Sequence, residues 1–103
     1  MKVSCHKVRK EVYGMLYQYI SFPDGTEINH SEVITDGENN KVRVYVEQWN
    51  KNINDFNILE VYLPECNITK LQGFTNEVAT RHLEHIRNLK NVIWECALER
   101  DGR

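Results

Sequence analysis

The clearest secondary-structure signal in this sequence is the stretch KVRVYVEQW, which runs from Lys41 to Trp49. Its three valines alternate with charged and aromatic residues, and this period of two is typical of a β-strand with one buried face. We expect the valine side to face a hydrophobic core. The other side carries Arg43, Tyr45, Glu47 and Trp49.

Similar strand patterns occur on both sides of this stretch, and turn-forming Pro, Gly and Asn residues separate them. We predict strands over Glu11–Phe22, Ile28–Ile34, Phe56–Leu63 and Ile68–Leu71. In the first of these strands, Leu16 and Ile20 are expected on one face and the tyrosines on the other. Those tyrosines are Tyr13, Tyr17 and Tyr19.

After Gly73 the hydrophobic period changes from two to about 3.6, the period of an amphipathic helix. Thr75 is a suitable N-cap, with Phe74 before it and Ala79 after it at the positions of a hydrophobic staple. Lys90 falls in the middle of the apolar stripe. Either its side chain extends out to solvent, or the helix bends near Asn88–Asn91. The pattern predicts a helix over about residues 75–99.

Strands followed by one helix predict a two-layer α+β fold. We expect an antiparallel sheet of four to five strands packed against one long C-terminal helix, in a single domain that spans residues 1–103. The strand-rich part covers residues 1–72. One helix is too narrow to cover so wide a sheet, so part of one sheet face should stay open.

Composition and charge exclude several classes of function. The chain has 103 residues, and its 13 Lys and Arg against 15 Asp and Glu leave a net charge of −2. That balance argues against a dedicated duplex-DNA binder. No apolar run approaches the roughly 18 residues of a membrane span or the pattern of a signal peptide. Three cysteines without a CxxC pair are typical of reduced thiols, so we predict a cytoplasmic protein with no cofactor and no membrane partner.

Charge is distributed unevenly along the chain. The first ten residues contain Lys2, Lys7, Arg9 and Lys10 and no acid. Residues 21–40 contain no Lys or Arg and five acids, namely Asp24, Glu27, Glu32, Asp36 and Glu38. A basic arm beside an acidic hairpin would direct self-association or the docking of a partner. The alternative is that both segments are simply solvated loops.

The histidines and cysteines raise a chemical alternative. His82 and His85 would share one flank of the predicted helix. A zinc site needs three or four ligands, and the others would have to come from Cys5, His6, Cys66 or Cys96, which show no recognised spacing. Adjacent Cys5 and His6 would point to opposite faces of a strand, which disfavours a Cys–His nucleophile. We therefore predict no catalytic residue and no metal ligand, and keep a small metal-binding protein or Cys/His enzyme as a third alternative.

The aromatic residues are the main candidates for a binding surface. The candidate residues are Tyr13, Tyr17, Tyr19, Arg43, Tyr45 and Trp49. Tyr and Trp are enriched at protein interfaces, which favours a protein partner or a homodimer. Single-stranded nucleic acid would stack on the same rings, with help from Lys41, Arg43 and the basic arm at residues 1–10. A third interpretation is that the rings pack on one another across the strands.

The last third of the chain resembles a known family. Ile68–Thr75 leads through Gly-Phe-Thr into a helix that carries Leu83, Ile86, Asn88 and Ile93-Trp94-Glu95. Roughly 30 of the 103 residues are similar to small bacterial domains of unknown function, often encoded near toxin–antitoxin-like genes. The family's Pro-Pro-His-x-His segment is missing, and only His30-Ser31-Glu32-Val33 stands in a comparable place. The resemblance implies a non-enzymatic accessory or antitoxin-like protein, with no catalytic residue to carry over.

These observations favour one function over the others. The sequence predicts a bacterial or phage-like accessory protein that recognises another protein, or a second copy of itself, through the aromatic face of its sheet. A single-stranded nucleic-acid binding module is the alternative.

Overall fold

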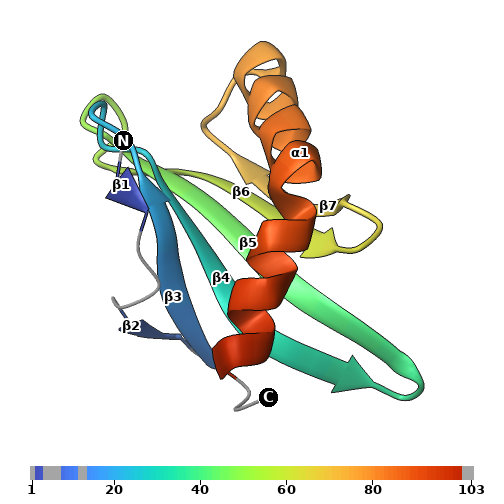
Figure 1. The fold of residues 1–103 in the computed structure, drawn as a ribbon. Coiled ribbons are helices and arrows are strands. Elements are labelled where there is room, and N and C mark those ends of the chain that lie inside the picture. The colour runs from blue at the N-terminus through green and yellow to red at the C-terminus, as the bar shows by residue number, and fades with distance from the viewer. Residues whose placement is uncertain (1, 4–7, 12–13, 101–103) are drawn as a thin grey trace.

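An antiparallel sheet with one long helix across it makes up the fold of the computed structural model (Figure 1). The structure describes residues 2–3, 8–11 and 14–100, and the side chains of residues 16–35 and 37–99. Its elements are β1 (Lys2–Val3), β2 (Val8–Glu11), β3 (Gly14–Ser21), β4 (Glu27–Asp36), β5 (Asn39–Asn50), β6 (Asp55–Leu63), β7 (Asn67–Gln72) and helix α1 (Asn76–Arg100). The predicted α+β class, an antiparallel sheet packed against one C-terminal helix, is confirmed.

The sheet is a meander with two short additions at one edge. Strands β3 to β7 each pair antiparallel with the next strand along the chain. Strands β1 and β2 pair with opposite ends of β3, along the edge that β4 does not use. Strand β7 forms the other edge of the sheet. Pairing between strands adjacent in sequence is the commonest arrangement, because short turns are enough to connect them.

Helix α1 begins where its capping residue predicts. The Val78 backbone N–H donates to Thr75 Oγ1 at 3.2 Å, and the Ala79 N–H donates to the Thr75 carbonyl at 2.9 Å. Thr75 is therefore the N-cap. The apolar stripe of the helix packs against β4, β5 and β6. Its buried members are Ala79, Ile86, Ile93 and Ala97.

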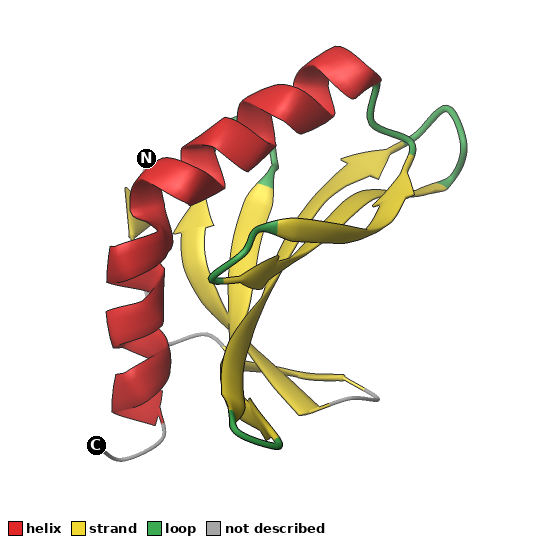
Figure 2. Cartoon of the chain, turned by 90° about the vertical axis from the view of Figure 1, so that its right-hand side faces the viewer, coloured by secondary structure: helices red, strands yellow, loops and turns green. Residues whose placement is uncertain are grey.

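We call the side of the sheet under α1 the helix face and the opposite side the far face. The core lies on the helix face, where Val42, Val44, Val46, Leu59, Val61 and Leu63 are fully buried. Figure 2 shows that α1 bends part-way along, so that its two halves lie over different parts of the sheet. Lys90 is exposed. Among the described residues, no helix combines the length and the apolar composition that a membrane crossing requires.

The strand predicted over Glu11–Phe22 is wrong at its start. Glu11 at the end of β2 pairs with Gly14 at the start of β3, so the chain reverses there. The overlooked signal was Gly14, because a glycine inside a strand pattern often marks a local irregularity of the backbone.

The predicted faces of β3 are also wrong. The register shifts between Gln18 and Ile20, which inserts an extra residue and changes the side on which the following residues lie. Ile20 therefore joins the core on the helix face. Leu16 instead packs with Tyr45 and Ile58 in a second, smaller cluster on the far face.

Candidate functional site

The predicted aromatic surface is divided between the two faces of the sheet. Tyr17 and Tyr19 lie beside His30, with ring centroids 5.8 and 6.4 Å from its imidazole, and His30 pairs with Val44 on the helix face. Tyr45 lies on the far face. Tyr13 lies outside the described residues. The candidate side chains therefore do not form one continuous surface.

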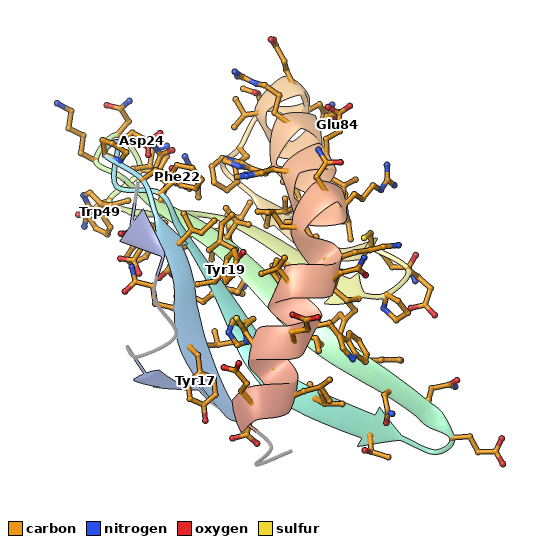
Figure 3. The ribbon with its side chains drawn as sticks, viewed as in Figure 1. Tyr17, Tyr19, Phe22, Asp24, Trp49 and Glu84 are labelled. Carbon is orange, nitrogen blue, oxygen red and sulfur yellow. The ribbon has the colours of Figure 1, made fainter. Side chains whose placement is uncertain are left out.

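Burial removes Tyr17, Tyr19 and Tyr45 from the candidate site. Tyr17, Tyr19 and Tyr45 are 7%, 3% and 9% exposed, whereas Trp49 is 52% exposed. Tyr17 Oη also donates a hydrogen bond to Glu32 Oε1 at 2.8 Å. Figure 3 shows Trp49 far from Tyr17 and Tyr19. Of the aromatic candidates that the structure describes, only Trp49 is available to a partner.

Arg43 is part of a buried polar network on the far face. Its side chain is 9% exposed, and its Nε donates to Glu60 Oε2 at 2.6 Å. The other oxygen of Glu60 accepts a hydrogen bond from Thr69 Oγ1 at 2.8 Å. The Arg43 guanidinium also lies 4.8 Å from the centroid of the Tyr45 ring, in cation–π contact. Arg43 thus neutralises an internal carboxylate instead of presenting its charge to a ligand.

The residue that sequence reasoning missed is Phe56. It pairs with Trp49 across β5 and β6, and the two rings meet edge to face with centroids 5.2 Å apart. Phe56 is 36% exposed, and Ile53 in the connecting loop is 50% exposed. We call Trp49, Ile53 and Phe56 the hairpin patch. The polar loop between the two aromatic residues was the available signal, because the ends of such a loop face each other in a hairpin.

The loop that carries the hairpin patch is internally hydrogen-bonded. The Asn52 N–H donates to Asn50 Oδ1 at 3.0 Å, and the Ile53 N–H donates to the Asn50 carbonyl at 3.3 Å. Asn54 has a φ of +52°, a left-handed conformation that Asn tolerates better than most residues. These contacts hold the patch in place, which lowers the entropy lost when a partner binds.

The histidines that the structure describes do not converge on a metal site. His82 lies edge to face with Phe74 at 5.1 Å, and His85 is tilted against Phe22 at 5.8 Å. Within the part of the chain that the structure describes, no three His, Cys, Asp or Glu side chains are grouped to hold an ion. Cys66 is buried in the turn after β6, and its thiol lies 3.7 Å from the Pro64 carbonyl.

A hollow of about 290 Å³ lies between the turn after β3 and the first half of α1. Its lining includes Asp24, Gln48, Arg81 and His82. Burial lowers the pKa of His82 below 6.5, although the nearby Asp24 carboxylate opposes this shift. The pKa of Asp24 is lowered, chiefly because its carboxylate accepts a hydrogen bond from the Thr26 backbone N–H at 2.9 Å. The pair therefore favours a neutral imidazole beside a carboxylate at neutral pH.

Comparison with known proteins assigns no family to this chain. No family model, curated protein or solved structure matches the chain. The resemblance to small bacterial domains near toxin–antitoxin-like genes stays a prediction.

Proposed function

We propose that this chain is a non-enzymatic accessory protein that binds another protein through the hairpin patch. The observation that carries the proposal is the pair of Trp49 and Phe56, which pack edge to face and yet remain 52% and 36% exposed. Tryptophan is enriched among the residues that contribute most to protein–protein binding. Two aromatic rings held on an ordered hairpin are suited to act as such anchors.

The shape of the patch favours a partner with a concave surface over a second copy of this chain. A standard interface buries about 800 Å² on each side, which is far more than three side chains at the end of a hairpin provide. A hollow on the partner that surrounds the hairpin end would supply the remaining area. Two copies that met hairpin to hairpin would bury little beyond the patch itself.

The nucleic-acid alternative loses Arg43, one of the cations on which it relied. Binding to single strands needs positive charge beside the aromatic rings. Arg43 is buried and ion-paired with Glu60, so its guanidinium does not reach a phosphate. Among the candidate aromatic residues that the structure describes, the exposed Trp49 still supports this alternative.

A matched pair of variants tests the proposal. The first is the double variant Trp49→Ser/Phe56→Ser. The control is Ile68→Ser/Leu71→Ser, which removes two comparably exposed apolar side chains, 46% and 42%, from β7. Wild type and control should retain the same protein from a lysate of the source cell, and the hairpin variant should lose it. The purified pair should show the same difference, with melting temperatures within about 4 °C of wild type.

Other results would contradict the proposal in distinct ways. A hairpin variant that keeps the partner would show that the patch does not bind it. If the wild type forms a dimer in sedimentation equilibrium and the hairpin variant does not, the partner bound at the hairpin patch is a second copy of this chain. Quenching of Trp49 fluorescence by mixed-sequence oligonucleotides that weakens steeply with salt would favour nucleic acid.

A further inference from the structure

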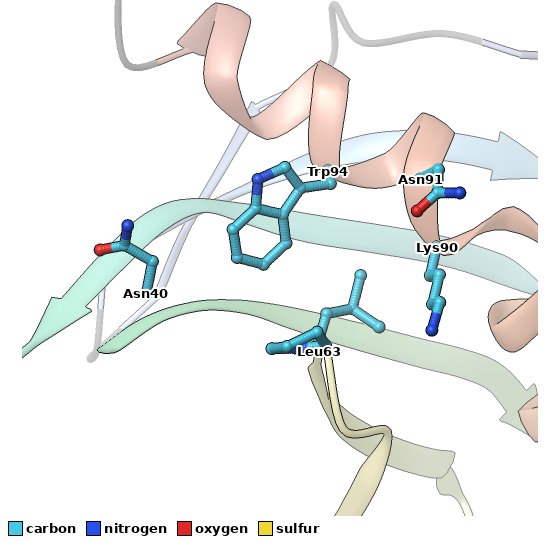
Figure 4. Close-up of a pocket in the computed structure, with 6 residues that line it drawn as sticks. Asn40, Leu63, Lys90, Asn91 and Trp94 are labelled. Atoms are coloured by element: carbon cyan, nitrogen blue, oxygen red, sulfur yellow. The ribbon is translucent and has the colours of Figure 1, made fainter. Parts of the chain in front are cut away.

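We propose that a groove between α1 and the sheet binds a small planar aromatic anion. The groove has a volume of about 410 Å³ and is lined by Asn40, Leu63, Pro64, Lys90, Asn91 and Trp94 (Figure 4). This volume lies in the range of about 300–1,000 Å³ that is usual for ligand pockets. Asn40 and Trp49 stand at opposite ends of β5, so this site is separate from the hairpin patch.

Lys90 breaks the apolar stripe of α1 at the groove. The stripe positions alternate by four and three residues, at residues 79, 83, 86, 90, 93 and 97. Ile86 and Ile93, on either side of Lys90, are fully buried, whereas Lys90 is exposed. An apolar residue at position 90 would continue the stripe. The chain instead leaves a hollow with a cation in its wall.

Several polar groups around the groove have no partner elsewhere in the described chain. Within the described part of the chain, the Lys90 ammonium, the Asn91 carboxamide and the Trp94 indole N–H make no hydrogen bond or ion pair. The Asn40 amide uses only its oxygen, which accepts from Thr35 Oγ1 at 3.3 Å. None of the described lining residues is acidic. The Lys90 ammonium and the Trp94 N–H can only donate hydrogen bonds, and with no acid in the described lining they suit a ligand that carries a carboxylate or a phosphate.

The remaining walls suit a flat apolar body. Figure 4 shows the Trp94 ring between Asn40 on one side and Lys90 and Asn91 on the other. The ring is partly buried and packs against the main core, so it is already held in place. Leu63 and Pro64 complete the apolar lining. An aromatic ring stacked on Trp94 would bring an anionic substituent within reach of Lys90.

Four probes distinguish the contribution of the aromatic ring to binding from that of the negative charge. They are benzoate, phenyl phosphate, neutral benzamide and inorganic phosphate. The readout is the indole N–H signal of Trp94 in ¹H–¹⁵N spectra, and Trp49→Phe assigns it because the chain has two tryptophans. We expect a saturable shift with benzoate or phenyl phosphate, and the stronger of the two identifies the head group. Benzamide and inorganic phosphate should bind at least about tenfold more weakly, because each lacks one of the two features.

Two substitutions of the same residue complete the test. Lys90→Gln should weaken binding of the charged aromatic probe about tenfold, while Lys51→Gln at the hairpin end should leave it unchanged. Lys90→Leu should abolish the shift without lowering the melting temperature, because leucine extends the buried stripe. If Lys90→Leu fails to fold, Lys90→Gln decides the question alone.

Four results would overturn the proposal, and three of them show directly that the ligand or the role of Lys90 is wrong. These three are the absence of a saturable shift with all four probes, benzamide binding as tightly as benzoate, and unchanged affinity in Lys90→Gln. Inorganic phosphate binding as tightly as phenyl phosphate would show attraction of charge only, and would also contradict an aromatic ligand. None of these results affects the hairpin patch.

Discussion

The two faces of strand β5 are both buried, but by different chemistry. Its three valines on the helix face are 0% exposed and contact other aliphatic side chains. On the far face, Arg43, Tyr45 and Glu47 are between 5% and 9% exposed. Burial on the helix face stabilises the fold because it removes apolar area from water. Burial on the far face is tolerable only where each charge has a partner, so stability there depends on particular pairs of atoms.

Neighbouring residues of β6 provide the sharpest test of this contrast, because Leu59 faces α1 and Glu60 faces away. Leu59→Ala should have the largest effect and lower the free energy of unfolding by about 3 kcal/mol, since it leaves a cavity in the core. Urea denaturation measures this loss. The volume-conserving control Leu59→Met should lower the free energy of unfolding by less than about 1.5 kcal/mol. A loss under about 1 kcal/mol for Leu59→Ala would mean that the helix face is loosely packed.

Glu60→Ala should cost slightly less, about 2–3 kcal/mol, because it leaves the Arg43 guanidinium buried without its carboxylate. The double variant Arg43→Met/Glu60→Leu should recover most of that loss, since no charge is then left unpaired. If the double variant is as unstable as Glu60→Ala, the far face depends on packing area and the contrast between the faces fails.

Thr69→Val should remove about 1 kcal/mol, because Thr69 Oγ1 donates to the same carboxylate at 2.8 Å. In the Glu60→Ala background the substitution should cost less, because the carboxylate is gone and Thr69 Oγ1 keeps only its longer 3.3 Å contact with the Glu60 carbonyl. A double-mutant cycle measures this coupling. Additive losses would show that Thr69 acts independently of the ion pair.

The smallest predicted effect comes from the helix side and depends on pH. The pKa of His82 is lowered in the folded chain, so the unfolded chain takes up the proton first as the pH falls below about 6.5. The contribution of His82 to the free energy of unfolding is therefore fully present above that pH, and it decreases slightly towards pH 5.5. Asp24, with its pKa lowered from 3.8, contributes a loss only at more acidic pH. His82→Gln should flatten this part of the stability profile, and a profile that rises towards pH 5.5 would contradict the assignment.

The sequence patterns predicted the helix face well and the far face poorly. The roles of the β5 valines and of the Thr75 cap can be predicted from the local sequence, because alternation and capping chemistry depend on near neighbours in the chain. The same alternation placed Tyr45 on the other side of the strand but did not show what would bury it. Likewise, the extra residue between Gln18 and Ile20 has no compositional signal. Phe56 was missed as a site residue because its exposure depends on which residue lies opposite it.

The position of α1 at the end of the meander has a consequence for biosynthesis. Strands β3 to β7 each pair with the next strand along the chain, so this part of the sheet can assemble as it leaves the ribosome. The 25 residues that cover its apolar face are made afterwards, which takes about 1–5 s at typical rates of synthesis. During that interval the valines of β5 have no cover. We therefore expect the nascent chain to expose this apolar sheet face, and to be prone to aggregation there, until α1 emerges.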